Sequence, residues 1–519
     1  MKHLLILLSV FLGIFTLSAQ HALLKLDFVY ATPEAGKITI DFTLANGAVD
    51  TARVFAQVID KSHPGYAIDF GTWSGDLGAQ SFDGSIKSVT WNYPDGSSPE
   101  NYILRLMVQN DRPVSVEDIV ADLDSNLMWQ NLLFIEGVRN QQTNPQHKTE
   151  VNQWLKSHLN TPKLFARNQA FNTGGTGLEN VIGRRQGFSS DSLIYVLDAH
   201  YDTVADSPGA DDNGSGTAAL VEITRVLNRY SFKNTLYACA FDGEEYGLLG
   251  SNAFLKSGTQ AGDRIQSALN FEMIGYYSDE PNSQEIPNGF EVLFPAQTTQ
   301  IIQNQKRGDF ITNVSNTNSQ VISSLFAEQA LNYSTAPVIT LPVPGKGEIT
   351  PDLRRSDHAS FWDKNIPALM ITDGANFRNK NYHTPHDTSG SLSINFMTNI
   401  ARVSLAVMAT QLEPINADDI YLLVENIISN KKTIEDFIEL EVYPQPAGAE
   451  IKLKFNSIIN KPLNIRLFDA QGKIVYQRDG MKISQGDVIN IPTQHIPAGI
   501  YILKINDDTH EMSRKVIRE

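Results

Sequence analysis

A chain of 519 residues is too long for one ordinary domain, so two to four are expected, and its composition is that of folded protein. The formal net charge of −16 argues against nucleic acid or an anionic membrane surface as the main partner. The single cysteine, Cys239, excludes a disulfide within the chain. It lies in a short apolar run and is predicted to be a buried, inert thiol.

Residues 1–19 have the pattern of a signal peptide. Lys2 and His3 precede an apolar run at residues 4–17, which is too short to span a bilayer comfortably and is followed by small residues. We therefore expect export with cleavage near Ala19. No other apolar stretch of the sequence is long enough to cross a membrane, so no stable membrane span is predicted.

Residues 20–115 alternate short β-rich runs with turn residues. Runs at 37–44, 54–59 and 102–108 are separated by clusters such as Pro94-Asp-Gly96. This pattern predicts an N-terminal β-sandwich-like domain. It contains no cluster of catalytic residue types.

Residues 116–413 change to strands that alternate with helices. Nearly continuous apolar strands are predicted at 193–197, 236–241 and 267–271, with an amphipathic helix at 217–229. Strands of this kind, linked by helices, predict an α/β fold with a parallel-rich mixed sheet and helices on both faces.

The last part of the chain returns to a β pattern. Residues 414–439 are predicted to form a helical linker, and residues 440–519 contain β runs spaced as in a small sandwich. The predicted α/β domain is therefore flanked by an N-terminal and a C-terminal β-sandwich module.

Charged side chains follow three of the predicted apolar strands. His200 and Asp202 follow the first, Glu244 and Glu245 the second, and Glu272 directly follows the third. In open α/β sheets, sites form at the carboxyl ends of the strands, so these side chains are expected to meet at one edge.

Taken singly, each of these features has an ordinary explanation. His200 and Asp202 could be polar loop residues, or a metal ligand and the carboxylate that orients it. Asp212, in the GADDNGSG segment at 209–216, could cap a helix, bridge two cations, or do both. The neighbouring Glu244 and Glu245 could form a solvated acidic loop, or one could bind a metal while the other accepts a proton from water.

Two downstream segments are further candidates. His383 lies in a proline-containing loop and could be a surface histidine, with His386 and Asp387 as competitors for the same role. The segment at residues 354–358 could be a salt-bridged loop or part of a pocket wall.

Taken together, the candidate histidines and carboxylates indicate a metal site more strongly than any of them does alone. Two histidines and three carboxylates suit zinc, which accepts imidazole nitrogen and carboxylate oxygen. With one carboxylate shared, each ion has three protein ligands, the arrangement of a two-metal hydrolase with ions about 3.5–4 Å apart.

Residues 120–413 resemble the zinc aminopeptidases of peptidase family M28, the aminopeptidase Y or leucyl aminopeptidase group. The matching motifs, in order, are AHYDT at 199–203, GADDNGSG at 209–216, DGEEYGL at 242–248, LNFEM at 269–273, RSDH at 355–358 and YHT at 382–384. The resemblance implies the zinc-peptidase (phosphorylase/hydrolase-like) fold and two Zn²⁺ ions.

The resemblance also implies a role for each residue. One ion would take His200 and Glu272, the other Glu245 and His383, with Asp212 bridging them. Glu244 would be the general base that activates a metal-bridged water. Asp202 would orient His200, and Tyr382 would donate a hydrogen bond to the oxyanion. Many relatives have aspartate at the position of Glu272.

Residues 440–519 resemble the type IX secretion sorting domain. The matching elements are VYPQP at 442–446, FDAQG at 468–472 and PAGIY at 497–501. The resemblance implies Sec export, recognition by the type IX secretion machinery, and a secreted or cell-surface location. A β-sandwich binding module is the alternative.

The leading functional hypothesis is a secreted aminopeptidase that acts on peptides or proteins. A glutaminyl cyclase, which shares the fold but resembles a one-zinc version of the site, is one alternative, and a carboxypeptidase or dipeptidase is another. A non-catalytic surface binding protein is a third. Residues 273–350 are expected to contribute the pocket wall.

Overall fold

The structure is a computed structural model of the chain. It describes residues 23–45, 51–62, 67–81, 86–161, 163–173, 176–189, 193–260, 262–429, 440–444, 446–456, 462–469, 473–506 and 511–519. The predicted signal peptide lies outside these residues. Within these ranges, the structure contains no helix of the length and apolarity that a membrane span requires.

The N-terminal β domain consists of two antiparallel sheets. One has the order β1-β2-β7-β5 and the other the order β19-β8-β3-β4, with β6 also paired to β3. The strands are β1 (Lys25–Glu34), β2 (Lys37–Ala45), β3 (Ala52–Asp60), β4 (Ala67–Ile68), β5 (Thr72–Gly75), β6 (Gly78–Gln80), β7 (Lys87–Asn92) and β8 (Tyr102–Gln109). Both sheets contribute to one core, where Trp91 and Leu106 are fully buried.

The remaining strand of this domain, β19 (Ala417–Leu423), comes from beyond the α/β domain. It pairs with β8 from Ala417 opposite Gln109 to Leu423 opposite Ile103, and the short helix α11 (Val424–Ser429) follows it. The prediction of a helical linker from residue 414 is therefore wrong for residues 417–423. Ile420 and Leu422 pack against the core of the N-terminal domain, and this burial favours a strand over a linker. Residues 430–439 of the predicted linker lie outside the described residues.

The α/β domain is built on an eight-stranded sheet of order β16-β15-β17-β14-β11-β13-β10-β9. Its strands are β9 (Phe165–Thr173), β10 (Thr176–Arg185), β11 (Ile194–His200), β13 (Thr235–Phe241), β14 (Ile265–Glu272), β15 (Ile311–Asn316), β16 (Val338–Val343) and β17 (Ala368–Thr372). Pairs β11–β13, β11–β14, β14–β17 and β15–β16 are parallel, and the other three are antiparallel. The predicted parallel-rich mixed sheet is confirmed.

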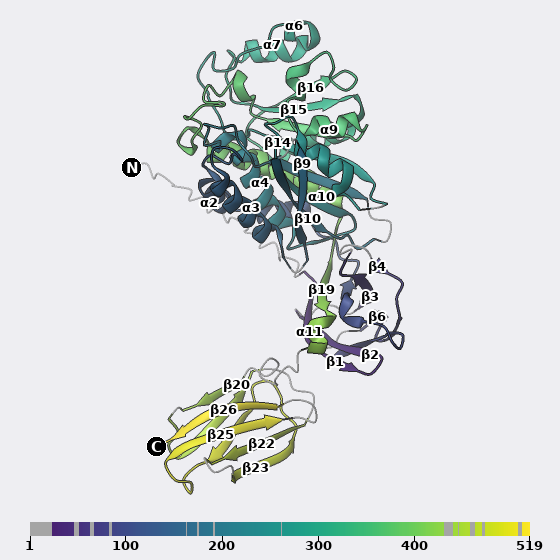
Figure 1. Cartoon of the computed structure of the whole chain (residues 1–519), viewed down its shortest axis with the longest axis vertical. Helices are drawn as coiled ribbons and strands as arrows, with labels where there is room; N and C mark the ends of the chain where they lie inside the picture. The colour runs from purple at the N-terminus through teal and green to yellow at the C-terminus, as the bar shows by residue number, and fades with distance from the viewer. Residues whose placement is uncertain are drawn as a thin grey trace, which may run out of the picture.

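Helices cover both faces of this sheet (Figure 1). They are α1 (Val116–Ala121), α2 (Ser125–Ile135), α3 (Pro145–Leu159), α4 (Gly216–Leu227), α5 (Leu249–Ala253), α6 (Phe290–Leu293), α7 (Pro295–Gln303), α8 (Gln320–Tyr333), α9 (His358–Asp363) and α10 (Ile394–Leu412). Successive strand residues alternate between two cores, so Leu197 of β11 packs in one and Val196 in the other.

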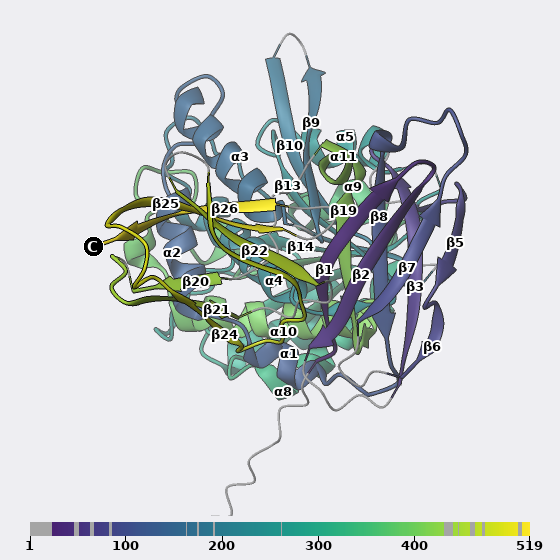
Figure 2. The same ribbon diagram turned by 90° about the horizontal axis from the view of Figure 1, so that it is seen from below.

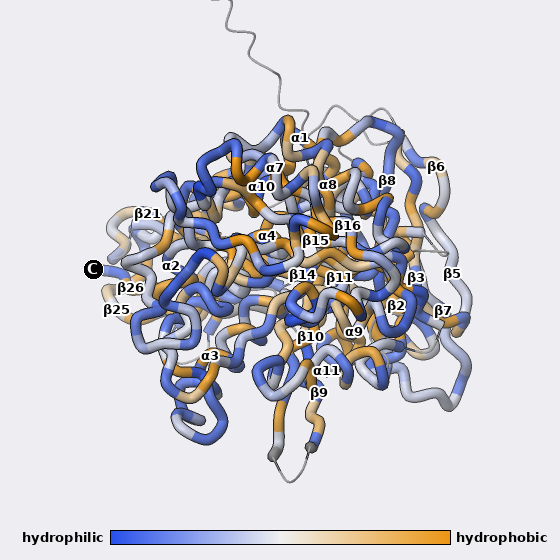
Figure 3. Tube along the Cα trace, turned by 90° about the horizontal axis from the view of Figure 1, so that it is seen from above, coloured by the Kyte–Doolittle hydropathy of each residue, from blue (hydrophilic) through white to orange (hydrophobic). Residues whose placement is uncertain are grey.

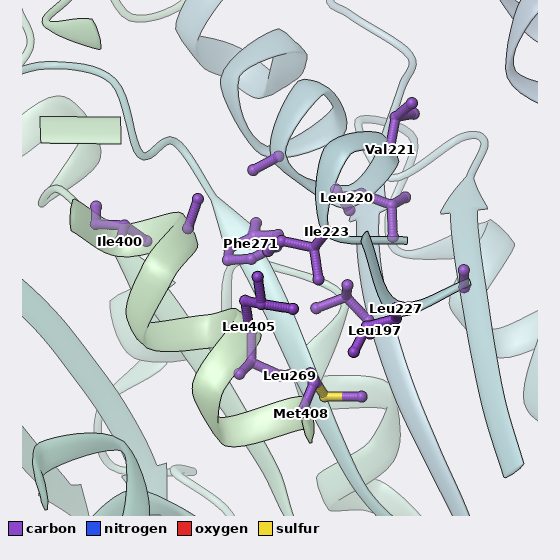
Figure 4. Packing of buried hydrophobic residues seen from close by; sticks show 14 of the residues in the cluster. Leu197, Leu220, Val221, Ile223, Leu227, Leu269, Phe271, Ile400, Leu405 and Met408 are labelled. Carbon is purple, nitrogen blue, oxygen red and sulfur yellow. The ribbon is translucent and has the colours of Figure 1, made fainter. Parts of the chain in front are cut away.

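The larger core lies under α4 and α10. Figure 4 shows Leu220 and Ile223 of α4 and Leu405 of α10 directed at Leu269 and Phe271 of β14. Hydrophobic segments gather along the central strands, and the peripheral turns are mostly hydrophilic (Figure 3). This packing fixes the carboxyl ends of β11, β13 and β14 relative to one another.

The C-terminal module also has two sheets. One contains β20 (Leu440–Tyr443), β21 (Glu450–Phe455) and β24 (Val488–Pro492). The other has the order β23-β22-β25-β26, with β22 (Leu463–Phe468), β23 (Ile474–Met481), β25 (Gly499–Asn506) and β26 (Glu511–Arg518). Alternate residues such as Ile451, Leu453 and Phe455 are buried in a core of their own. The predicted fold class, an α/β domain flanked by two β modules, is therefore confirmed.

Candidate metal centre and active site

Three neighbouring parallel strands bring the predicted site residues to one edge of the sheet. His200 is the last residue of β11 and Glu272 the last of β14, while Glu244 and Glu245 lie in the loop that follows β13. Because β14, β11 and β13 are adjacent and parallel, their carboxyl ends lie side by side.

A first group of side chains surrounds the ring of His200. Its Nε2 lies 3.4 Å from Asp212 Oδ1, 3.4 Å from Glu272 Oε2 and 3.9 Å from Glu244 Oε2. His200, Glu244 and Glu272 can all direct one ligand atom at a common point. The Glu244 carboxylate is the most distant of the three carboxylates from the ring nitrogen.

A second group surrounds His383. Its Nε2 lies 3.1 Å from both Asp212 Oδ2 and Glu245 Oε2, and these three residues also converge on a common point. Asp212 therefore directs one carboxylate oxygen at each group. The structure brings together all five predicted ligands and Glu244.

Several of these atoms are buried without a partner. Nε2 of His200, Oδ2 of Asp212, Oε1 of Glu245 and Oε2 of Glu272 have no hydrogen-bond partner in the described part of the chain. Buried polar atoms in native proteins are almost always satisfied. Three carboxylates and one imidazole with unpaired atoms fit a pair of bound cations, and this mixed nitrogen and oxygen donor set fits zinc.

The electrostatics of the two groups agree with a need for positive charge. Burial alone would lower the pKa of His200, but Glu244, Asp202 and Asp212 together raise it well above its ordinary value. Burial, and then the neighbouring carboxylate of Asp212, raises the pKa of Glu245 to about 7. Burial, opposed in part by His200, raises the pKa of the Glu244 carboxyl well above its usual range.

Asp202 links the histidine to the acidic loop. Its two carboxylate oxygens accept hydrogen bonds from the backbone N–H groups of Glu244 (3.1 Å) and Glu245 (3.3 Å). Oδ1 of Asp202 also lies 3.5 Å from Nδ1 of His200, the nitrogen that faces away from the first group. One buried carboxylate thus positions residues of both groups.

Asp212 does not cap a helix. The helix α4 begins after Ser215, and its first backbone N–H group donates to Asn213 Oδ1 at 3.2 Å. Asp212 precedes the helix with φ −98° and ψ 92°, which is not helical. Its backbone N–H and that of Asp211 each donate to the Asp387 carboxylate at 3.0 Å. The capping interpretation of Asp212 is therefore wrong, and Asp387 holds the loop instead of competing with His383.

The other candidates around His383 have separate positions. His386 is exposed, whereas Tyr382 stacks on the His383 ring with the two centroids 3.8 Å apart. The Tyr382 hydroxyl accepts a hydrogen bond from Arg355 Nη2 at 2.7 Å, which leaves its own proton available to donate. Burial, and then the charge of Asp212, raises the pKa of this hydroxyl above its ordinary value, so it stays protonated.

Three residues of the segment 354–358 have different roles. Arg354 forms an ion pair with Asp363, and Arg355 lines a pocket beside Glu272. His358 is fully buried, and a ring nitrogen lies 2.9 Å from the carbonyl oxygen of Leu353. Burial lowers the pKa of His358 to about 4, so its ring is neutral and structural.

Arg139 is a site-supporting residue that sequence reasoning missed. Its fully buried guanidinium donates to five backbone carbonyl oxygens at 2.6–2.9 Å, which belong to Ile135, Gly137, Tyr201, Pro208 and Gly209. These carbonyls border the loops that carry His200 and Asp212. No motif marks Arg139 in the sequence, because its partners are backbone atoms.

An apolar pocket adjoins the first group. Glu272, Arg355 and Tyr382 lie at its polar side, and its inner wall is mainly aliphatic and aromatic. That wall includes Ile286, Phe290, Ile301, Phe310, Val314, Ile339, Leu341 and Met370. The sequence-based expectation that residues 273–350 contribute the wall agrees with this lining.

Two family models match the chain. Residues 180–408 match peptidase family M28, and residues 441–519 match the secretion system C-terminal sorting domain. The matched segments contain all the predicted ligands and the three sorting-domain motifs.

Curated relatives align over the same region. The chain is 33% identical over 228 residues to the uncharacterized protein YfbL of Escherichia coli, an alignment that covers 41% of this chain and 65% of YfbL. It is 26% identical over 244 residues to aminopeptidase Y of Saccharomyces cerevisiae, covering 44% of this chain and 38% of that protein. The chain therefore spans less than two thirds of the length of either relative.

Among solved structures, the chain is similar to the LapA aminopeptidase of Legionella pneumophila, with a TM-score of 0.44 and 22% sequence identity. This similarity covers 57% of this chain and 73% of that one. Together with the two family matches, the site geometry identifies the central domain: the chain carries a peptidase family M28 domain, followed by a secretion system C-terminal sorting domain.

Proposed function

We propose that the chain is a secreted two-zinc aminopeptidase that hydrolyses the N-terminal peptide bond of peptides or proteins. The observation that supports this best is the pair of three-residue groups with Asp212 between them. His200, Asp212 and Glu272 would hold one zinc ion, and Asp212, Glu245 and His383 the other. Zinc ions bound there would polarise the scissile carbonyl and lower the pKa of water.

Glu244 is the proposed general base. Its carboxylate lies beside the first group but farther from the His200 ring than the other carboxylates. Its raised pKa gives it the proton affinity to take a proton from the attacking water and to deliver it to the leaving amine. Tyr382, protonated and held by Arg355, donates a hydrogen bond to the oxyanion.

The apolar pocket is the proposed site for the side chain of the N-terminal residue. It opens beside Glu272, so a substrate whose first side chain fills it places its free amine and scissile carbonyl near the acidic groups. Its lining favours bulky apolar residues at the N-terminus.

The presence of both groups supports this proposal over a one-zinc glutaminyl cyclase. A cyclase of that kind does not need both His200 and Asp212 as ligands, whereas here Asp212 lies 3.4 Å from His200 in the first group and 3.1 Å from His383 in the second. The C-terminal sorting domain supports export through the type IX secretion machinery to the cell surface or the medium.

Substitution Glu244→Gln tests the mechanism. It preserves size and removes the base, so kcat on a leucyl peptide should fall by about 10²–10⁴-fold, while metal analysis still finds two zinc ions per chain. Glu328→Gln, an exposed change on α8, is the matched control and should retain activity. Full activity of Glu244→Gln with zinc bound would refute the mechanism, and one zinc with cyclisation of N-terminal glutamine would favour the cyclase.

A further inference from the structure

A second cavity lies on the other side of the metal centre. It is bounded by the hairpin β9–β10 and by helix α3, and we call it the hairpin groove. The residues that line it include Lys148 and Asn152 of α3, Ala170 and Glu179 of the hairpin, and Tyr201 and Asp242 on its floor. Its volume of about 600 Å³ is within the range of ligand-binding clefts. The hairpin extends well beyond the rest of the sheet (Figure 2).

The hairpin groove opens at the same edge of the sheet as the metal centre. β10 runs antiparallel to β13, so Glu179, near the start of β10, lies at the carboxyl end of β13. Tyr201 stands between His200 and Asp202 in the chain, and Asp242 precedes Glu244 by two residues. The floor of the groove is thus continuous with the loops that carry the site residues.

The sheet order places the two cavities on opposite sides of the site. The apolar pocket is lined from β15, β16 and β17, and the hairpin groove from β9 and β10. Strands β14, β11 and β13, which carry the metal centre, lie between them. A chain that crosses the metal centre along this edge therefore has one cavity on each side of its scissile bond.

The lining of the hairpin groove mixes polar and apolar residues and is more polar than that of the apolar pocket. Lys148 Nζ forms a buried ion pair with Asp242 Oδ2 at 2.7 Å. Asn152 Nδ2 donates to the Tyr201 hydroxyl at 3.0 Å, and this hydroxyl donates to the carbonyl oxygen of Glu179 at 2.8 Å. Fixed hydrogen-bonding groups of this kind complement the amide groups of an extended peptide.

The charge of the hairpin groove is negative. Lys148 and Asp242 neutralise each other, which leaves the exposed carboxylate of Glu179 as the uncompensated charge on the lining residues. The Glu179 carboxylate accepts a hydrogen bond from the neutral side-chain amide of Asn168, whose Nδ2 lies 2.7 Å from Oε2. A bound segment with a basic side chain gains from this charge, and an acidic one loses.

We propose that the hairpin groove binds the part of a peptide substrate that follows the scissile bond. The preferred substrates are then peptides of at least three residues, with neutral or basic residues after the N-terminal one. This inference rests on the proposed aminopeptidase function, since it takes the apolar pocket as the site of the N-terminal side chain.

The test compares kcat/KM for substrates that share an N-terminal leucine. Leucyl p-nitroanilide reports activity on a substrate with no peptide segment after the leucine. A dipeptide and three tetrapeptides add such a segment, and the tetrapeptides have a neutral residue, lysine or glutamate at the third position. We expect the neutral tetrapeptide to exceed the dipeptide by about tenfold, and lysine to exceed glutamate by about fivefold.

Two variants connect these ratios to the hairpin groove. Glu179→Gln should bring the lysine-to-glutamate ratio close to one, and Ala170→Trp, which fills the groove, should remove the advantage of the tetrapeptide. Glu328→Gln, remote on α8, should leave both ratios as they are in the parent chain. Zinc content and thermal unfolding report that each variant is folded.

The outcomes separate the inference from the function on which it rests. If neither the p-nitroanilide nor any peptide is hydrolysed by the zinc-loaded chain, the proposed function fails, and the inference with it. If they are hydrolysed but the ratios are near one, or are unchanged in Glu179→Gln and Ala170→Trp, the inference alone is overturned.

Discussion

Replacing Asp419 by asparagine tests how the N-terminal domain is attached to the M28 domain. Asp419, on β19, is fully buried and lies 2.7 Å from Arg105 of β8, 3.0 Å from Arg185 of β10 and 3.5 Å from Lys163. Two of these cations belong to the M28 domain, and Arg105 belongs to the N-terminal domain. The carboxylate is therefore the shared counter-ion of three cations across the boundary.

The expected loss of folding stability in Asp419→Asn follows from the burial of this cluster of charges. At 3 Å and an effective dielectric constant near 20, each contact is worth roughly 5 kcal/mol of Coulomb energy before desolvation is subtracted. Removing one partner of a buried pair costs about 3–5 kcal/mol, because the remaining charge stays buried. For Asp419→Asn we expect a loss of this size, or a fall in Tm of about 6–20 °C.

Thermal and urea unfolding of the full chain measure this loss. The matched control is Asp363→Asn, which removes the exposed partner of Arg354 and should cost at most about 1 kcal/mol. A loss below about 1 kcal/mol for Asp419→Asn would show that the cluster does not hold the two domains together, and would refute this reasoning.

The stabilisation that the Asp419 carboxylate contributes depends on pH. Burial alone would raise the pKa of Asp419, but Arg185, Arg105 and Lys163 together hold it well below its ordinary value. A group whose folded pKa is depressed stabilises the fold above its unfolded pKa, near 3.9, and loses that contribution as the pH falls further. The difference between the parent chain and Asp419→Asn should therefore be constant at neutral pH and shrink below about pH 4.

Three further predictions concern the metal centre. Asp202→Asn should weaken zinc affinity or activity by about 10–100-fold, because the Asp202 carboxylate accepts from two backbone N–H groups and lies beside His200. Zinc titration and peptide hydrolysis measure these changes, and unchanged values would contradict the positioning role of Asp202. Tyr382→Phe should lower kcat by about 10²–10³-fold with little change in KM, as loss of an oxyanion donor does; a change in KM alone would assign Tyr382 to binding. Chelation of zinc should abolish hydrolysis and lower the Tm, because the carboxylates around Asp212 lose their counter-charge, and an unchanged Tm would argue against a metal in these two groups.

The central sheet and the placement of its site residues could be predicted from the sequence. Apolar runs such as residues 236–241 and 267–271 mark buried strands, and both strands are present. Because parallel strands end at a common edge, the charged residues directly after them had to meet, and His200 and Glu272 lie 3.4 Å apart. Local pattern and topology agree here, so the prediction was accurate.

Features that depend on distant partners were not predictable. Residues 417–423 contain two aspartates, and only the pairing of β19 with β8, more than 300 positions earlier, makes this segment a strand. Arg139 acts through backbone carbonyls that no sequence pattern identifies. The assignment of His358 to structure and of Asp387 to the Asp212 loop likewise required their three-dimensional neighbours.

The route of the chain through the N-terminal domain bears on the stability of the metal centre. β8 precedes the M28 domain, and β19 follows α10, so both ends of that domain are fixed in one sheet. The two groups of site residues hold Asp212, Glu244, Glu245 and Glu272 close together, and without bound cations the repulsion of these carboxylates opposes folding. A framework closed at both ends, with Asp419 buried at the boundary, raises the cost of opening the M28 domain. We therefore regard the N-terminal domain as a structural support of the M28 domain, and not as an independent module.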